Sequence, residues 1–260
     1  MKSFFVRWGL TLSLVGGTLF GGVATVTTFN QPALALTDQQ VKAKLDSIPV
    51  FVVTNDKGLP LSRTLPTKNG QQTISVTGAY MSRQEALKFI QDLQKAKNKN
   101  PKLQAMAKNL QVTAVPLGVI YQQLQQNRNK PNRLVFAFKP VDREVRGALT
   151  LLQASGQKVD AEKFKTSVPI FAVRFAPDKG YVPIQGGQNK QQMIPLFLSK
   201  QDAQNLLNKV KPKFPQADIQ VINFDGVIKT LKDKNDSWLN QVFLVPSAES
   251  RKYIETLPKK

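Results

Sequence analysis

The chain contains an internal repeat, and this feature constrains its fold more than any other. The segment SIPVFVV at Ser47–Val53 returns as SVPIFAV at Ser167–Val173, 120 residues later. Two copies are too few for an open solenoid, because such arrays need about three or more units to bury a core. The repeat therefore predicts one body made of two pseudo-symmetric halves.

Further matches follow in the same order in both halves. MSRQEALKFI at 81–90 matches LSKQDAQNLL at 198–207, LQVTAVPLGVI at 110–120 matches DIQVINFDGVI at 218–228, and VFAFKP at 135–140 matches VFLVPS at 242–247. An ordered set of this kind is hard to obtain by chance. It divides the chain into a first repeat at 36–154 and a second repeat at 155–260.

Each half is predicted to contain four strands. Apolar runs and period-two alternation place them at 50–54, 73–81, 112–115 and 134–138, and again at 170–175, 193–198, 219–223 and 242–245. The polar segments 62–72 and 185–192 are predicted to be exposed loops. Strands mixed with helices in this order predict an α+β fold in which helices pack on sheets.

Helices are predicted after the second strand and at the end of each half. Ser82 and Glu85 match a capping box, in which the Ser oxygen accepts a backbone N–H and the Glu reaches back to its own N-cap. Ser199 and Asp202 stand at the equivalent place. Apolar residues recur on one face behind both caps, as expected of helices on a sheet. Shorter helices are predicted at 118–125 and 226–231, closing helices at 142–154 and 248–257, and a short polar linker at 155–167, with the start of a further helix as the alternative for this linker.

The first 35 residues have the pattern of a secretory signal peptide. Lys2 and Arg7 form a basic region, Trp8–Phe29 is mostly apolar and uncharged, and Ala33-Leu34-Ala35 is an A-x-A cleavage site. Cleavage after Ala35 is predicted, and the protein is then exported. Because the apolar run is long for a signal peptide, a retained membrane anchor is the alternative.

The charge of the chain favours an acidic partner. The net charge is +20, of which Lys2 and Arg7 contribute two. Such a charge attracts an acidic polypeptide or an anionic membrane surface. Nucleic acid is not predicted, because the stacking aromatics interleaved with Arg that single-strand binders use are missing. Solubility alone is the other explanation of the charge.

The sequence supports no catalytic, metal or cofactor site. It contains no His and no Cys, which removes the usual general base, thiol catalysis and thiolate metal sites. It has neither a P-loop nor a dinucleotide fingerprint. A catalytic dyad of a Ser with a basic residue is not supported. Ser82 and Ser199 lie next to Arg83 and Lys200 in the sequence, but adjacent helical residues do not face each other. Asp225, before Gly226, could mark a catalytic turn, but the preference of Asp for turns explains it. We therefore predict that the protein is not an enzyme.

Four residues just before the capped helices are candidates for contact with peptide. They are Tyr80, Met81, Met193 and Phe197. Flexible thioethers and aromatic rings suit adaptable binding surfaces. Packing in the core is the alternative for all four.

Three segments of the chain resemble one known family. Ile48–Leu61, Met81–Leu93 and Val112–Tyr121, with their echoes in the second half, are similar to the twenty-two-kilodalton component of the protein translocon at the inner chloroplast envelope and its cyanobacterial relatives. No single motif is diagnostic, and no site residue is transferred from the family. The resemblance rests on the ordered set of segments and on the duplication.

The resemblance implies a soluble protein that works between two membranes. The place is the chloroplast intermembrane space, or the cyanobacterial periplasm or thylakoid lumen, and the bacterial-style signal peptide favours the cyanobacterial setting. It also implies two related halves with apolar surface depressions and a chaperone-like role in handing on unfolded precursors. The implied clients include outer-membrane barrel proteins, and the barrel-assembly machinery is an implied partner. A scaffold subunit that docks one fixed partner is the alternative, and a hydrolase with paired acids in a cleft is a third reading.

Overall fold

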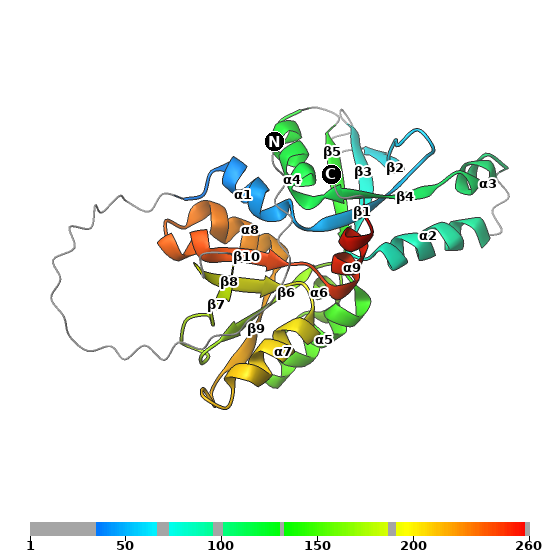
Figure 1. Cartoon of the computed structure of the whole chain (residues 1–260). Coiled ribbons are helices and arrows are strands. Elements are labelled where there is room, and N and C mark those ends of the chain that lie inside the picture. The colour runs from blue at the N-terminus through cyan, green and yellow to red at the C-terminus, as the bar shows by residue number, and fades with distance from the viewer. Residues whose placement is uncertain (1–34, 67–72, 96–100, 131–132, 187–190, 258–260) are drawn as a thin grey trace.

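The structure is a computed structural model, and it describes residues 35–66, 73–95, 101–130, 133–186 and 191–257. These residues form helices and two five-stranded sheets, one in each half of the sequence (Figure 1). The predicted α+β fold with two similar halves in one body is confirmed.

The two sheets share one topology. Their strands are β1 (Pro49–Thr54), β2 (Ser62–Pro66), β3 (Thr73–Tyr80), β4 (Gln111–Pro116) and β5 (Leu134–Lys139), and then β6 (Pro169–Arg174), β7 (Ile184–Gly186), β8 (Gln191–Phe197), β9 (Asp218–Asn223) and β10 (Val242–Val245). In the first sheet β1 lies between β4 and β3, both antiparallel to it, and β5 joins β3 in parallel. In the second sheet β6, β9, β8 and β10 repeat this arrangement. The short pairings of β2 with β3 and of β7 with β8 also correspond.

Helices follow the strands in the same order in both halves. They are α1 (Asp38–Leu45), α2 (Arg83–Lys95), α3 (Pro101–Lys108), α4 (Leu117–Asn127), α5 (Asp142–Ala154), α6 (Ala161–Phe164), α7 (Lys200–Val210), α8 (Phe224–Asp233) and α9 (Ala248–Thr256), with a 3-10 helix at Ser237–Gln241. By order and by position after equivalent strands, α2 corresponds to α7, α4 to α8 and α5 to α9.

Several elements differ from the sequence-based expectation. Helices α1 and α3 and the 3-10 helix lie where no element is predicted. Strand β2 and most of β7 lie in the two polar segments that are predicted to be loops. Strand β2 pairs with β3 from Ser62 opposite Thr77 to Pro66 opposite Thr73. Four of its five residues are exposed, so the strand buries no face and leaves no hydrophobic alternation to detect.

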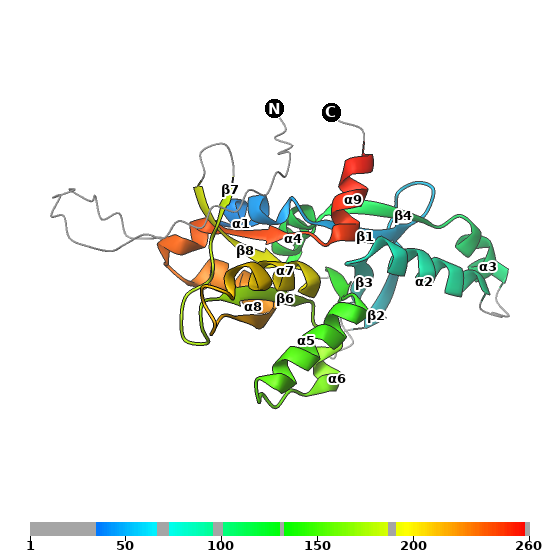
Figure 2. The same ribbon diagram turned by 60° about the horizontal axis from the view of Figure 1, so that its bottom comes forward.

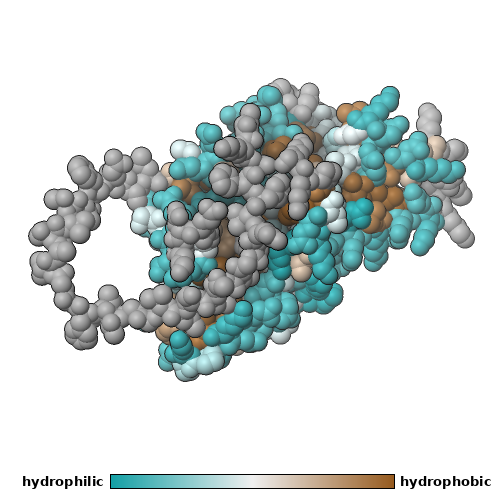
Figure 3. Space-filling model, viewed as in Figure 1, coloured by the Kyte–Doolittle hydropathy of each residue, from teal (hydrophilic) through white to brown (hydrophobic). Residues whose placement is uncertain are grey.

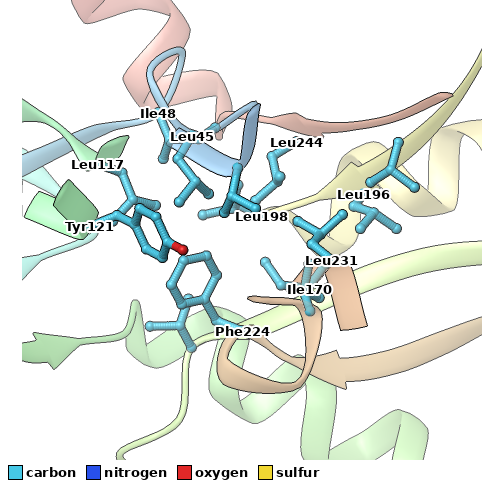
Figure 4. Close-up of a cluster of buried hydrophobic side chains, with 14 of the residues drawn as sticks. Leu45, Ile48, Leu117, Tyr121, Ile170, Leu196, Leu198, Phe224, Leu231 and Leu244 are labelled. Atoms are coloured by element: carbon cyan, nitrogen blue, oxygen red, sulfur yellow. The ribbon is translucent and has the colours of Figure 1, made fainter. Parts of the chain in front are cut away.

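A shared hydrophobic core joins the halves. Val50 and Val52 of β1 and Ile170 and Ala172 of β6 all belong to it. Helices α1, α4 and α8 add further side chains, so that leucines, isoleucines and rings from both halves meet (Figure 4). The residues between these positions point to the opposite face of each sheet, where two separate clusters lie under α2 and α7. The shared core is what makes the two repeats one body.

The closing helices exchange sheets. Helix α5 follows the first sheet in the sequence but packs on β6, β9 and α7 of the second half. Helix α9 follows the second sheet but places Tyr253 edge-on against Phe51 of the first, with ring centroids 5.2 Å apart. Figures 1 and 2 show α5 near α7, and α9 near β1 and α2. The boundaries of the two repeats at 36–154 and 155–260 stay a prediction. In space, the last helix of each repeat packs on the sheet of the other repeat.

Buried or half-buried carboxylates secure this exchange. The Glu144 carboxylate of α5 accepts the backbone N–H of Lys200 at the start of α7, at 2.8 Å. The Glu249 carboxylate of α9 accepts the Ser82 hydroxyl at 2.8 Å and the backbone N–H of Gln84 at 3.0 Å, at the start of α2. A negative group at a helix N-terminus satisfies unpaired N–H groups and opposes the helix dipole. Each exchanged helix therefore caps a helix of the other half.

The capping boxes are realised only in part. Ser82 accepts the N–H of Glu85 at 3.3 Å, as predicted. The Glu85 carboxylate does not reach back to its own N-cap but accepts the backbone N–H of Asp142 in α5, at 3.2 Å. The carboxylate of Asp202 likewise binds the Arg251 guanidinium of α9, at 2.8 Å. Each acid therefore joins a helix to the closing helix of its own repeat, because Glu85 joins α2 to α5 and Asp202 joins α7 to α9.

Tyr80 makes the stability of the fold sensitive to alkali. Burial, helped by the charge of Glu85, raises the pKa of Tyr80 from 10.0 to about 12. Because the fold favours the neutral phenol, this contribution to stability is complete below pH 10 and is lost as the pH rises towards 12. The urea midpoint should therefore fall over this window more steeply for the parent than for Tyr80→Phe. Equal slopes for the two proteins would show that Tyr80 titrates as an exposed phenol.

Candidate functional site

An apolar pocket opens between α4 and α8, where the two halves meet. Its volume is about 170 Å³. A dry cavity of about 150 Å³ accommodates a benzene molecule, so this pocket has room for one apolar side chain. It is lined by Leu45, Leu117, Tyr121, Leu124, Gln125, Phe138, Phe224, Asp225 and Ile228.

The repeat positions both walls of the pocket. Helices α4 and α8 begin directly after β4 and β9, without a loop. The N–H of Leu117 donates to the Ile48 carbonyl at 2.8 Å, and the N–H of Phe224 donates to the Val168 carbonyl at 2.9 Å. These equivalent hydrogen bonds fix where each helix starts. The Phe224 ring then lies 5.9 Å from the ring of Phe138, and Figure 4 shows it beside Tyr121.

A polar cluster fastens α1 to both walls. The Tyr121 hydroxyl donates to the Asp38 carboxylate at 2.5 Å, and the Lys232 ammonium lies 3.1 Å from the same carboxylate. The hydrogen bond from Tyr121, followed by Lys232, lowers the pKa of Asp38. Burial, followed by the bond to Asp38, raises the pKa of Tyr121. The cluster therefore holds a neutral phenol and an ionised carboxylate at neutral pH.

The two walls differ at one equivalent position. Gly118 of α4 lies so close to α1 that a Cβ there would be 2.5 Å from the Lys42 carbonyl oxygen and would also meet the Asp46 carboxylate. The sequence match aligns Gly118 with Gly226, but the strand registers and the equivalent hydrogen bonds of Leu117 and Phe224 shift the equivalence by one residue, to Asp225. Asp225 is exposed at the rim of the pocket. Across the described residues, no group of three or more His, Cys, Asp or Glu side chains lies close enough to hold a metal ion.

The four residues predicted to contact peptide do not share one surface. Tyr80, Met81 and Phe197 are 8%, 5% and 8% exposed, and Met193 is half-buried. Tyr80 packs under α2, Met81 lies in the shared core, and Phe197 and Met193 pack under α7. Their contact with peptide stays a prediction.

Sequence analysis did not find the pocket residues. Leu124 and Ile228 are half-buried on helices that were predicted from the sequence. One signal for the pocket was present in the sequence. The two short predicted helices carry apolar residues on more of their surface than one narrow face needs, which indicates an apolar surface beyond the core contact. No helix in the described part of the chain is long and apolar enough to cross a membrane. The predicted signal peptide lies outside the described residues, apart from its last residue, Ala35.

Comparison with known proteins gives consistent results. The model of the Tic22-like family matches residues 14–256. The structure of Tic22 from Anabaena, a protein of protein transport, is 66% identical, with a TM-score of 0.82 over 86% of this chain and 99% of that one. Tic22 from Plasmodium falciparum is 20% identical, with a TM-score of 0.58 over 83% of this chain and 96% of that one, which shows the fold alone. No curated protein matches the chain. With the family model covering nearly the whole sequence, the chain belongs to the Tic22-like family.

Proposed function

We propose that the chain takes part in protein transport, as a chaperone-like carrier that holds unfolded precursor proteins and passes them on without ATP. The observation that carries this proposal is the apolar pocket between α4 and α8. The protein-transport role of the Anabaena relative supports it. The lack of a nucleotide motif in the sequence argues for release without ATP.

The pocket suits weak and reversible binding. One apolar side chain that enters it gains about 25 cal/mol for each Å² of apolar surface covered. Ordering the flexible client costs part of this gain, so the affinity should be modest. Removal of the signal peptide takes away Lys2 and Arg7, so the net charge falls from +20 to +18. This charge speeds the encounter with acidic precursors and with an anionic membrane surface.

The proposed setting is an exported one. We place the protein in the periplasm or the thylakoid lumen, with the signal peptide removed after Ala35. Outer-membrane barrel proteins are the proposed clients, and the barrel-assembly machinery is the proposed receiving partner. Sequencing the N-terminus of the natural protein should find Leu36 first, whereas an intact Met1 would favour a retained anchor.

A scaffold that docks one fixed partner is the second candidate. The small size of the pocket supports it, because a pocket with room for one side chain suits a single residue of a fixed partner. Promiscuity separates the two functions. A carrier binds several unrelated unfolded chains weakly, and a scaffold binds one folded partner tightly.

An aggregation assay tests the proposal. The chain from residue 36 onwards should suppress the aggregation of an unfolded outer-membrane barrel protein without ATP. Added salt should slow capture but weaken holding only slightly, because apolar contacts are not screened. No suppression of any client at several-fold excess would favour the scaffold. Suppression that disappears with salt would identify the positive charge as the binding surface.

A further inference from the structure

The outer faces of the two sheets are covered unequally. On the second sheet, Leu206 and Val210 of α7 are 5% and 0% exposed. The equivalent residues of α2 are Phe89 and Leu93, and both are only half-buried. The apolar cluster between α2 and the first sheet is bordered by half-buried apolar side chains, which are Leu61, Phe89, Leu110, Val112, Ala114 and Tyr253. Figure 3 shows a hydrophobic patch over the region where β4, α2 and α9 meet in Figure 1.

The difference lies in the exchanged helices. Helix α5 has 13 residues and buries Val145, Ala148 and Leu152 among others. Helix α9 has nine residues, and Ser250 is the residue that it buries fully. Helix α9 ends at Thr256, and Leu257, which follows it, is 41% exposed. At 3.6 residues per turn, α9 is about one turn shorter than α5, and it covers the first sheet with fewer buried apolar side chains.

We propose that the outer face of the first sheet binds an amphipathic helix of a partner protein, and that the polar side of this helix is acidic. The purpose of this binding rests on the proposed carrier function. Helix α5 on the second sheet is the internal precedent for a helix on the equivalent face. The charges around the face select the acidic polar side of the partner. On α2, α3 and α9 the exposed cations are Arg83, Lys88, Lys95, Lys108 and Lys252, against the exposed acids Asp92 and Glu255.

Helix α9 occupies part of this site and is displaced when the partner helix binds. It is held by the hydrogen bonds of Glu249 to the start of α2 and by the ring of Tyr253. The Arg83 guanidinium lies 5.9 Å from the centre of the same ring. A short terminal helix with so few buried apolar residues opens at a lower free energy than the core. The partner binds the open form, so its apparent affinity rises with the open fraction.

The experiment uses a labelled peptide with the sequence of residues 141–155, in which Arg143→Glu and Arg146→Glu make the polar side acidic. Fluorescence anisotropy with the full chain should show saturable binding. Phe89→Glu should reduce the affinity at least tenfold, and Gln91→Glu, an exposed position on the same helix, should not. Tyr253→Ala should tighten binding about tenfold, because it loosens α9, and Thr256→Ala should have no effect. If Phe89→Glu proves unfolded in urea titration, Leu61→Glu takes its place.

Three results would overturn the inference: no binding, binding that survives the substitution at Phe89, or weaker binding by Tyr253→Ala. The aggregation assay, run on the same proteins, separates this failure from that of the proposed function. If the parent holds clients but the peptide does not show the expected binding, only the proposed helix site is wrong. If the parent holds no client, the carrier function fails whatever the peptide shows.

Discussion

Leu124→Asp is expected to lower client holding at least tenfold, because it places a charge in the pocket between α4 and α8. Leu124 lines the pocket and is half-buried. An apolar client side chain that enters would cover the carboxylate, and an unpaired charge resists loss of its water. A tenfold loss corresponds to about 1.4 kcal/mol of binding free energy. Aggregation suppression at a series of protein concentrations measures the loss.

The matched control for this variant is Gln122→Asp. Gln122 is exposed on the same helix and does not line the pocket. It receives the same charge, so any loss from net charge alone appears in both variants. Far-UV circular dichroism and the urea midpoint show that each variant is folded. If both variants hold clients as well as the parent does, the pocket is not the binding surface.

Gly118→Ala is expected to destabilise the fold by about 1–3 kcal/mol, the usual cost of overpacking. The new Cβ would lie 2.5 Å from the Lys42 carbonyl oxygen, and backbone cannot move aside as a side chain can. Helix α1 must therefore shift away from α4. The shift should also break the hydrogen bond from Tyr121 to Asp38. Urea unfolding followed by circular dichroism measures the change in the free energy of unfolding.

Gly147→Ala in α5 is the control for this substitution. A Cβ at Gly147 would lie 2.8 Å from Cδ of Lys200, in a flexible side chain that can move. Inside a helix, Ala is favoured over Gly by about 0.5–1 kcal/mol, so this variant should be equal to or more stable than the parent. A Gly118→Ala protein as stable as Gly147→Ala would show that α1 is not tightly packed on α4.

The candidate site was less accessible to sequence reasoning than the fold. The pattern around Tyr80, Met81, Met193 and Phe197 marked residues with suitable chemistry, but the structure divides them among three apolar clusters. Chemistry of a side chain does not tell which sheet face it occupies. The pocket depends on α4 and α8 meeting across the two halves, and such contacts join residues about 100 positions apart.

The sequence by itself determined the repeat, the order of the main strands and helices, and many of their limits. Helix α5 at 142–154 and strand β10 at 242–245 have the predicted bounds. Local signals suffice for these elements, because hydrophobic period, capping residues and turn residues act within a few positions. They also suffice for the capped start of α2 at Ser82, where the hydroxyl accepts the predicted N–H.

Only the tertiary structure decided which sheet each closing helix covers. The apolar stripe of α5 predicts a partner surface but not whose surface it is, because either sheet offers an apolar face. The choice follows from long-range contacts, among them Glu144 with Lys200 and Tyr253 with Phe51. The position of α5 also explains why the Glu85 carboxylate accepts the backbone N–H of Asp142 and not that of its own N-cap residue. Burial and capping across the halves are properties of the assembled fold, and no local stretch of sequence contains them.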